Sequence, residues 1–482
     1  MQYALVWLRR DLRLGDNPAL QAALEAGLVP VPVYIQDVAD GDLPAGGASA
    51  WWLHHSLTAL DRDLRDQGSR LLLRRGDPAR ELPALARQLG THKLFWNRRY
   101  EPHHLARDRT LKHLLGDAGL DVQDFPGNLL REPWQLLKAD GTPYRVFTPY
   151  WKALQRTGIT AGSNTPLAWP TGDAPEADSL PLGELQLLPA IPWDAAFPDV
   201  WRPGEAGAWQ SLDRFCTDAL VDYPTDRDRP DLPGTSRLSP HLHFGEISPR
   251  QLWTALSHWG QQHARPGTLA AIEAFQRQLA WRDFAHQLLH HFPHTAREPL
   301  DRRFAQFPWA RDYAEPLRRW QRGQTGIPIV DAGMRELWHS GWMHNRVRMI
   351  AASLLTKNLR IPWQEGADWF MDTLVDADLA NNTLGWQWVA GCGADAAPYF
   401  RIFNPVRQGE RFDPDGAYVR RWVPELGRLP AKWIHCPWEA PAAVLEAAGI
   451  EPGRDYPAPM VDLAASRTRA LAAWEEIKSI PR

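Results

Sequence analysis

The stretch DADLANNTLGWQW, residues 376–388, places two aspartates, two asparagines and two tryptophans within thirteen positions. An ordinary core does not require so many polar groups beside indole rings. Tryptophan is a bulky residue whose N–H group needs a partner when it is buried, and the chain contains 25 of them. The pattern indicates stacking or electron transfer, and the alternative for many of these rings is simple core and interface packing.

A second group of candidate residues lies in FQRQLAWRDF. Gln278, Trp281 and Arg282 are spaced by three and four positions, which places them on one face of a helix. An amide, a flat ring and a guanidinium side by side suit a planar heteroaromatic ligand or a nucleic-acid base. The alternative is that Trp281 packs in the core and Arg282 forms a surface ion pair.

A third group lies in GWMHNRVRMIAAS, where helical spacing puts Trp342, Asn345 and Met349 on one stripe. Asparagine is a poor residue inside a helix, so its amide is expected to have a specific partner. Arg346 and Arg348 flank the stripe, and the alternative for Arg346 is a solvated charge.

The segment GTSRLSPHLHFGEISPRQLW begins with a turn of small residues. Its hydroxyl and backbone N–H groups can hold a phosphate beside Arg237, as anion-binding turns do. The alternative is helix capping, because Ser248 followed by Pro249 is a good N-cap and first-turn pair.

His286 and His290 stand four positions apart, a spacing that suits zinc. A zinc site normally needs a third protein ligand, and no cysteine or carboxylate stands at a confirming offset. Pro293 ends the helix before His294 can extend the row. No metal site is therefore predicted.

The segments that carry these candidate residues come after a predicted N-terminal α/β domain. Apolar runs predict strands over 3–8, 29–35, 69–77 and 93–100, and amphipathic patterns predict helices over 48–68 and 78–90. This alternation is typical of a Rossmann-like domain with a parallel sheet. No GxGxxG motif follows a strand, which disfavours a nicotinamide-dependent dehydrogenase.

The rest of the chain is predicted to be all-α. Beyond residue 200 the periodicity is helical, including one continuous helix over 364–380. Seven prolines between 161 and 200 are typical of a connection between domains. The predicted organisation is an α/β domain over 1–131, a linker over 132–199 and a helical domain over 200–482.

Composition limits the class of protein. The net charge of -3 means that any nucleic-acid binding must come from a local basic patch. The three cysteines, Cys216, Cys392 and Cys436, are far apart, which predicts buried thiols in a reducing compartment. No signal peptide and no uninterrupted apolar run of about 18 residues is present, so we expect a soluble, cytoplasmic protein with no membrane partner.

Taken in order, these segments resemble the photolyase and cryptochrome flavoprotein family over essentially the whole chain. The resemblance rests on VWLRRDLRLGDNPAL, TSRLSP, WRDF, PIVDAGMRELWHSGWMHNRVRM and DADLANNTLGWQWVAGCGADAAPYFRIFNPVRQGERFD. LANNTLGWQW and PELGRLPAKWIHCPWEAP are most similar to bacterial cyclobutane-dimer photolyases of the class related to plant cryptochromes. The resemblance implies an N-terminal antenna domain and a C-terminal helical domain that holds FAD in a bent conformation.

The resemblance also implies the residues that bind FAD. Arg348 and Asp376 would form an ion pair beside the flavin, Asp378 would hold its pyrimidine edge, and Asn382 would face N5. Phosphate and ribityl contacts would come from the turn around Arg237. The whole implied set is Tyr223, Thr235, Ser236, Arg237, Leu238, Ser239, Arg282, Asn345, Arg348, Asp376, Asp378 and Asn382.

The same resemblance implies an electron relay. Trp386 would be its first member and Trp363 its second, since tunnelling needs closely spaced, oxidisable rings. Trp309 matches the third member after a one-residue insertion, and Trp320 is a nearby alternative. The implied catalytic set is Asn382, Gln278, Trp386, Trp363 and Trp309.

For its substrate, the family flips a damaged dinucleotide out of the duplex into a cavity over the flavin. Trp281 and Trp388 would be stacking walls, and the arginines would grip phosphates without reading sequence. The implied lesion and DNA contacts are Arg227, Gln278, Trp281, Asn345, Arg346, Met349, Trp388 and Arg401.

Gln278 departs from the family pattern. Cyclobutane-dimer photolyases usually have a glutamate there; glutamine keeps an N–H donor but cannot exchange a proton. Enzymes of the 6-4 photoproduct branch carry Gln at this place, yet they rely on histidines where this chain has Asn345 and Met349. The cyclobutane interpretation therefore leads.

The leading prediction is a monomeric, blue-light-driven DNA repair lyase that splits cyclobutane pyrimidine dimers by electron transfer from reduced FAD. The alternative is a cryptochrome-like photoreceptor with weak or no repair, which Gln278 supports; a small-molecule oxidoreductase has little support. His103 and His104 stand where some folate-binding relatives have Asn and Glu. The branch resemblance nevertheless favours methenyltetrahydrofolate over a deazaflavin as the antenna.

Overall fold

The computed structural model describes residues 2–37, 46–163, 167–170, 176–263, 265–396 and 401–481. The chain forms two units, each assembled from segments that are distant in sequence. Unit 1 comprises Met1–Val221, Ser236–His291 and Val375–Asp378, and unit 2 comprises Asp222–Thr235, Phe292–Leu374 and Leu379–Arg482.

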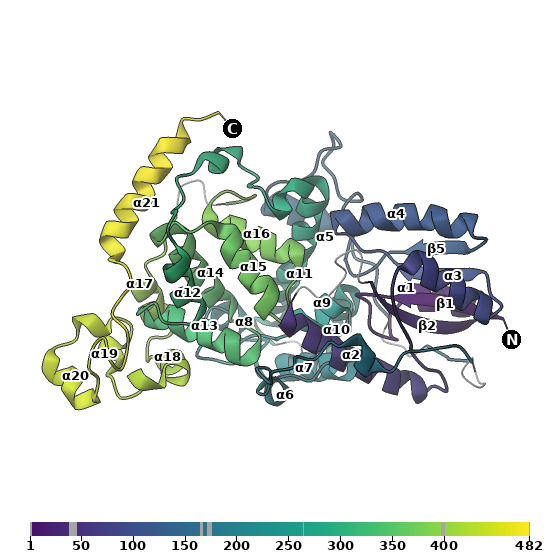
Figure 1. The fold of residues 1–482 in the computed structure, drawn as a ribbon, viewed down its shortest axis with the longest axis horizontal. Helices are drawn as coiled ribbons and strands as arrows, with labels where there is room; N and C mark the ends of the chain where they lie inside the picture. Colours follow the sequence, from purple (N-terminus) through teal and green to yellow (C-terminus); the bar gives the residue numbers. More distant parts are fainter. Residues whose placement is uncertain are drawn as a thin grey trace. The chain divides into compact units, whose positions relative to one another are not determined.

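A five-stranded parallel sheet forms the N-terminal part of unit 1 (Figure 1). Its strands are β1 (Tyr3–Leu8), β2 (Val29–Gln36), β3 (Leu72–Arg75), β4 (Lys93–Asn97) and β5 (Asp121–Phe125). The strand order is β3-β2-β1-β4-β5, and every neighbouring pair is parallel. The predicted parallel sheet and its four predicted strands are confirmed, and β5 is an additional strand that the apolar pattern missed.

Helices cover both faces of this sheet because alternate residues of a strand point to opposite sides. Leu5 and Trp7 of β1 pack in a core with leucines of two helices on one face. Ala4 and Val6, which point the other way, are fully buried. The covering helices are α1 (Pro18–Glu25), α2 (Gly47–Arg65), α3 (Pro78–Gln88) and α4 (Pro102–Asp117).

The remainder of unit 1 is helical. Ser248 caps α10 with a full capping box to Gln251, so the capping interpretation of Ser248 is confirmed. The predicted linker contains α5, which packs on α11; the predicted domain limits stay a prediction. The elements are α5 (Phe147–Thr157), a 3-10 turn (Leu182–Leu185), α6 (Phe197–Val200), α7 (Glu205–Asp218), α9 (Ser239–Phe244), α10 (Pro249–Gln262) and α11 (Thr268–His291).

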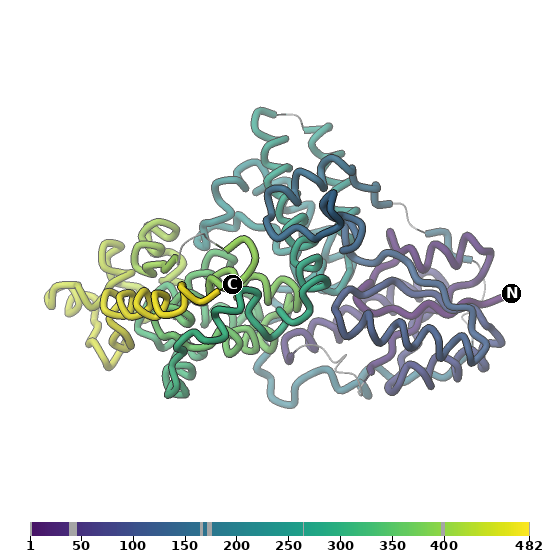
Figure 2. The backbone as a smooth tube through the Cα atoms, turned by 90° about the horizontal axis from the view of Figure 1, so that it is seen from above, coloured from purple at the N-terminus to yellow at the C-terminus, as the bar shows by residue number. Residues whose placement is uncertain are grey.

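The regular elements described in unit 2 are helices, apart from one isolated β-bridge between Pro452 and Tyr456. The centre of the unit is α13 (Pro328–Ser340), which packs on α14 (Asn345–Ser353) and α18 (Ala417–Trp422). A π-helical turn, Leu354–Asn358, continues α14 and packs on α21 (Leu463–Lys478), the yellow helix in Figure 2. The other elements are α8 (Tyr223–Asp226), α12 (Ala314–Gln321), α15 (Trp363–Thr373), α16 (Leu379–Ala390), α17 (Pro405–Phe412), α19 (Ala431–Ile434), α20 (Ala442–Ala448) and 3-10 turns at Pro293–Ala296, Arg302–Gln306, Pro424–Leu426 and Pro437–Glu439.

Two sequence-based predictions about helices are wrong. The continuous helix over 364–380 is divided, because α15 ends at Thr373, Leu374 is extended and α16 begins at Leu379. Asn345 does not lie inside a helix: it is the first residue of α14, after the N-cap His344. The break places Asp376 and Asp378 in the short non-helical connection between α15 and α16.

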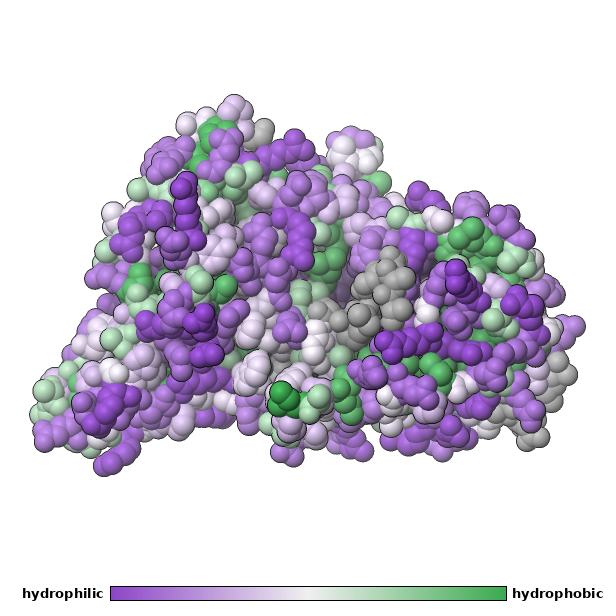
Figure 3. Space-filling view, viewed as in Figure 1, coloured by the Kyte–Doolittle hydropathy of each residue, from purple (hydrophilic) through white to green (hydrophobic). Residues whose placement is uncertain are grey.

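The surface in Figure 3 is dominated by hydrophilic side chains, with apolar ones in small groups. Within the described ranges, every helix is too short or too polar to cross a bilayer. Cys216, Cys392 and Cys436 are buried free thiols, as predicted.

Candidate functional site

Helix α11 presents the predicted group Gln278, Trp281 and Arg282. Trp281 stacks on Phe147 of α5, with ring centroids 3.8 Å apart and planes at 9°. One face of the indole is therefore covered by protein, which fixes the ring. Gln278 Nε2 donates to the carbonyl of Ala274 at 3.2 Å, so the amide leans back along its own helix.

Arg282 binds backbone carbonyls. Its guanidinium donates to the carbonyl oxygen of Asn128 at 2.5 Å and to that of Leu242 at 3.4 Å. These contacts replace the surface ion pair considered from the sequence. The charge is held between the loop at Asn128 and helix α9, in the same unit as Asp378.

Asp378 lies between two imidazoles of unit 1. Its Oδ2 is 3.7 Å from Nδ1 of His243 on α9 and 3.5 Å from Nε2 of His286 on α11. Burial alone would raise the pKa of Asp378, but His286, His243 and Arg282 outweigh burial and hold that pKa far below its usual range. Asp378 is therefore an anion that can only accept hydrogen bonds.

The turn at Ser236–Ser239 has the geometry of an anion-binding turn. Arg237 has a left-handed φ of 54°, and Leu238 follows with φ -84° and ψ -3°. Alternating hands of this kind point successive N–H groups to one side. The Leu238 N–H also donates to Ser236 Oγ at 3.3 Å, and the Arg237 guanidinium lies 5.7 Å from the ring of Trp201.

Two further residues of the implied cofactor set, Tyr223 and Thr235, lie in the first segment of unit 2. Tyr223 is buried, and the Arg227 guanidinium lies over its ring at 5.5 Å. Burial raises the pKa of the Tyr223 hydroxyl, which keeps it protonated and able to donate. Thr235 ends the same segment.

Asn382 and Trp386 lie on α16. Asn382 Nδ2 donates to the carbonyl of Ala367 at 2.9 Å, which orients the amide. Trp386 is buried and meets Phe370 edge-on, at a centroid distance of 5.0 Å. A Cβ on Gly366 would lie 2.0 Å from the Trp386 ring, so only glycine at that position allows the indole its place.

The tryptophans of unit 2 differ in exposure, which decides which of them could be the last ring of the electron relay. Trp363 is 2% exposed at the start of α15, and Trp320 is fully buried, with its Nε1 donating to Ala351 O at 3.1 Å. Trp320 meets Trp386 at 6.2 Å. Trp309 is partly exposed, which a last, solvent-reachable ring requires. Trp309 therefore stays the predicted third member.

Helix α14 carries the amide and sulfur predicted at the lesion. Asn345 is exposed, and its Nδ2 lies 3.9 Å from the sulfur of Met349, so these two share a stripe. Trp342 precedes the helix and is not on that stripe. Arg348 Nε donates to Met343 O at 2.7 Å.

The predicted phosphate-binding arginines of unit 2 are held differently. Arg346 pairs with Asp228 at 2.6 Å and lies over the Phe412 ring at 4.4 Å, so it is not a simple solvated charge. Arg401 is exposed, and Trp388 of α16 is partly buried.

Sequence reasoning missed the anchor of the segment at Arg401. Lys357 in the π-helical turn is 1% exposed, and its Nζ donates to Arg401 O at 2.6 Å. Ser353 Oγ accepts from the N–H of Phe403 at 3.2 Å. Burial lowers the pKa of Lys357 to about 7. π-Helical turns are frequent at functional sites, and that geometry has no signal in apolar periodicity.

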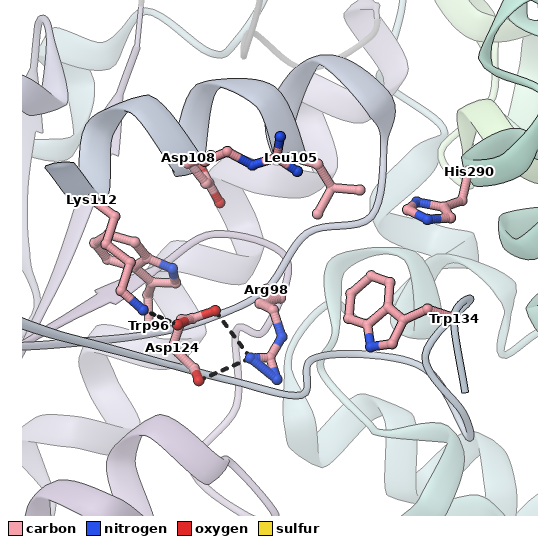
Figure 4. A pocket seen from close by; sticks show the side chains of 9 residues that line it. Trp96, Arg98, Leu105, Asp108, Lys112, Asp124, Trp134 and His290 are labelled. Atoms are coloured by element: carbon pink, nitrogen blue, oxygen red, sulfur yellow. Dashed lines mark hydrogen bonds and ion pairs between the residues drawn. The ribbon is translucent and has the colours of Figure 1, made fainter.

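A pocket of about 430 Å³ opens in unit 1 between β4, β5, α4 and the loop at Trp134 (Figure 4). Asp124 binds both Arg98 and Lys112 on its floor, at 3.0 and 2.5 Å. Its lining is Trp96, Arg98, Leu105, Asp108, Arg109, Lys112, Asp124, Trp134 and His290.

The histidines expected near an antenna lie at the start of α4. The rings of His103 and His104 are 3.7 Å apart, and His104 Nδ1 is 3.6 Å from Glu101. His290 meets Trp134 at 5.4 Å, whereas His286 faces Asp378. In the described part of the chain no set of three histidine, cysteine or acidic ligands gathers.

Two family models match this chain, one in each half. The family described as "FAD binding domain of DNA photolyase" matches residues 275–476, and "DNA photolyase" matches residues 4–170. The deoxyribodipyrimidine photo-lyase of Agrobacterium fabrum is 49% identical over 483 residues, 98% of each chain. Cryptochrome-1 of Arabidopsis thaliana is 38% identical, over 98% of this chain and 70% of its own length.

Solved structures agree. A bacterial class III photolyase from Agrobacterium tumefaciens superposes with a TM-score of 0.94 at 49% identity, covering 99% of this chain and 98% of that one. A Synechocystis cryptochrome gives a TM-score of 0.88 at 30% identity, covering 99% of both chains.

Proposed function

Because the chain belongs to the DNA photolyase and cryptochrome family, we propose that it is a FAD-dependent, blue-light-driven lyase that splits cyclobutane pyrimidine dimers in DNA. The observation that carries the proposal is its identity of 49% with the photo-lyase of Agrobacterium fabrum over 98% of both chains. The match to the FAD-binding domain of that family covers α14, α16 and the part of α11 from residue 275 onward.

The residues present fit FAD. The turn at Arg237 offers aligned N–H groups for phosphate, and Asp378 offers an anionic acceptor for the N–H of a pyrimidine edge. Asn382 presents an oriented amide, with its Nδ2 fixed on Ala367 O. When bound, FAD supplies light absorption and the electron that opens the dimer. Arg348 and Asp376 as a flanking ion pair remain part of this proposal.

The lesion contacts follow from α11. Because Phe147 covers one face of Trp281, the opposite face is the one that stacks on a flipped base. The amide N–H of Gln278, one turn earlier, donates to a base carbonyl where an acid is usual. In unit 2, the amide of Asn345 and the sulfur of Met349 are the proposed contacts to the second base, and Trp388 is the second proposed stacking residue.

The photoreceptor is the second candidate, and Gln278 is the observation that favours it. The chain is also 38% and 39% identical to two Arabidopsis thaliana cryptochromes. In this alternative the same FAD is photoreduced through the tryptophans, and the output is a conformational change or a partner in place of DNA repair.

The test is repair of a defined cyclobutane thymine dimer by anaerobically reduced, FAD-loaded protein in blue light. We expect the native protein to split the dimer, and Gln278→Glu to split it faster because a protonated acid donates more strongly. If only the Gln278→Glu variant splits the dimer, the photoreceptor becomes the favoured hypothesis. No splitting by either variant, with FAD bound, would refute the lyase.

DNA affinity is predicted to fall as the salt concentration rises, because the proposed contacts of Arg227, Arg346 and Arg401 are made to phosphates. Each phosphate contact contributes a slope of about -0.9 in log affinity against log salt. Arg401→Gln is expected to make the slope shallower by about one unit, measured by titration of dimer-containing duplex at several salt concentrations. Arg407→Gln, which removes an exposed arginine paired to Glu410, is the control and should leave the slope unchanged. An identical slope in Arg401→Gln would contradict the assignment.

A folate antenna is the finer part of the proposal, and the pocket at Trp134 supports it. Trp96 and Trp134 suit a planar pterin, while Arg98, Arg109 and Lys112 suit carboxylates. Methenyltetrahydrofolate carries both features, and a deazaflavin is the second choice. A monomeric state and a cytoplasmic location stay predictions.

A further inference from the structure

Asp378 faces two histidines, His243 and His286, and these two differ in the other hydrogen bonds that their rings make. His286 is held by its helix, since its Nδ1 donates to Arg282 O at 3.0 Å. Only its Nε2 faces Asp378. His243 is 8% exposed, and within the described ranges neither of its ring nitrogens has a hydrogen-bond partner. Its 3.7 Å approach to Asp378 Oδ2 is longer than a hydrogen bond.

The His243 imidazole is buried, and the Asp378 carboxylate faces its Nδ1 as an ion-pair partner that is available when the ring binds a proton. The apolar ring of Phe244 packs against it, at a centroid distance of 4.7 Å, and offers no polar partner. The charged and titratable groups that face the pair of His243 and Asp378 are Arg10, Glu101, Arg282 and His286.

These surroundings keep His243 neutral at rest. Burial, and then the Arg10 charge, lower the pKa of His243 to about 4, against the opposing attraction of Asp378. Asp378 holds its charge to still lower pH. If a further negative charge arrives beside this pair, the imidazole is therefore the first of the two groups to bind a proton.

Reduction of the flavin supplies such a charge. Two electrons and one proton convert neutral oxidised flavin to an anion, and an anion beside the Asp378 carboxylate is repelled strongly in a buried site. An imidazolium at His243 would offset that repulsion. This step rests on the proposed function, which places Asp378 at the pyrimidine edge of FAD.

We propose that His243 is a redox-linked proton acceptor, which binds a second proton when FAD is reduced and releases it on reoxidation. The balance is two electrons and two protons: one proton joins the flavin and one joins the His243 ring. The first electrons come from an added reductant such as dithionite, so neither light nor DNA is needed. His243 acts as a positioning residue for charge, through Asp378.

The experiment is the midpoint potential of the FAD-loaded protein against pH, in darkness, between about pH 5 and 8. For a two-electron couple each proton taken up lowers the potential by about 30 mV per pH unit. We expect two protons in the native protein, about 60 mV per unit, and one proton in His243→Gln. His263→Gln is the matched control, because its exposed imidazole is bound to Trp259 O at the end of α10 and does not face Asp378; this variant should keep two protons.

A one-proton slope in the native protein, or an unchanged slope in His243→Gln, would overturn the proposal. If His243→Gln fails to fold, the native protein still decides: with isotope-labelled histidine, the reduced-minus-oxidised infrared difference spectrum should show an imidazolium band, and its absence would overturn the proposal. If the native protein binds FAD but takes up only one proton on reduction, the His243 proposal fails and the lyase proposal is unaffected. Failure of the native protein to bind FAD would refute the lyase and the His243 proposal together.

Discussion

Replacing Trp386 by phenylalanine abolishes light-driven reduction of oxidised FAD and leaves dimer splitting by chemically reduced protein unchanged. A phenyl ring is much harder to oxidise than an indole, so the first step of the relay is lost. The fold tolerates the change, because an aromatic ring still fills the space beside Phe370 and Gly366. The relay only charges the cofactor, so repair by reduced protein does not need it.

The measurement is anaerobic absorbance bleaching of the flavin in blue light with a thiol donor, beside a repair assay after dithionite reduction. Trp433→Phe is the control, since that ring lies against Lys432 on α19 and belongs to no implied relay. Loss of both activities in Trp386→Phe would contradict the division of labour. Full photoreduction would show that electrons enter by another ring.

Replacing Lys357 by methionine raises the free energy of unfolding near neutral pH and weakens DNA binding. Burial lowers the pKa of the native amine from 10.5 to about 7, so between these values the unfolded chain binds more protons than the folded one. The free energy of unfolding of the native protein therefore rises with pH across this window, and the contribution of Lys357 is least favourable below about pH 7. Methionine fills similar space without that cost.

The advantage of Lys357→Met over the native protein is expected to shrink by on the order of 4 kcal/mol between about pH 7 and 10, measured by urea unfolding at several pH values. At the alkaline end the variant should be slightly the less stable, because it lacks the hydrogen bond to Arg401 O, worth about 1 kcal/mol. Dimer-DNA affinity should fall at every pH, since the Arg401 backbone is released. A stability difference that does not vary with pH would exclude a buried, titrating amine.

The sequence predicts the four apolar strands and misses β5, which is polar. β1 to β4 stand out because buried parallel strands are nearly continuous apolar runs. β5 reads DVQDF, with no fully buried residue, since it lies at the sheet edge. Apolar patterning therefore carries no information on it.

The break between α15 and α16 is hidden for a related reason. Helical spacing of apolar residues continues through LVDADLA, so periodicity predicts one helix. Leu374 nevertheless leaves the helical region, and the buried Asp378 is compensated by His243 and His286, which lie 135 and 92 residues earlier in the chain. Local sequence does not contain that compensation.

Motif spacing placed Gln278, Trp281 and Arg282 on one helix face, because i, i+3 and i, i+4 contacts are local. The pairing of Lys357 with Arg401 and of His243 with Asp378 depends on long-range packing. His286 and His290 show the limit of spacing alone, since one faces a carboxylate and the other an aromatic pocket wall.

The strand order has a consequence for the behaviour of concentrated protein. β3 and β5 are the sheet's outer strands, and bare outer strands recruit other chains into aggregates. The chain covers β3 itself, since Ser179 Oγ accepts from Leu73 N–H and Leu180 N–H donates to Leu73 O. β5 carries Asp121 and Asp124, whose charges oppose docking of a second sheet. In concentrated protein, neither edge of the described sheet therefore offers a bare apolar strand on which edge-to-edge association can start.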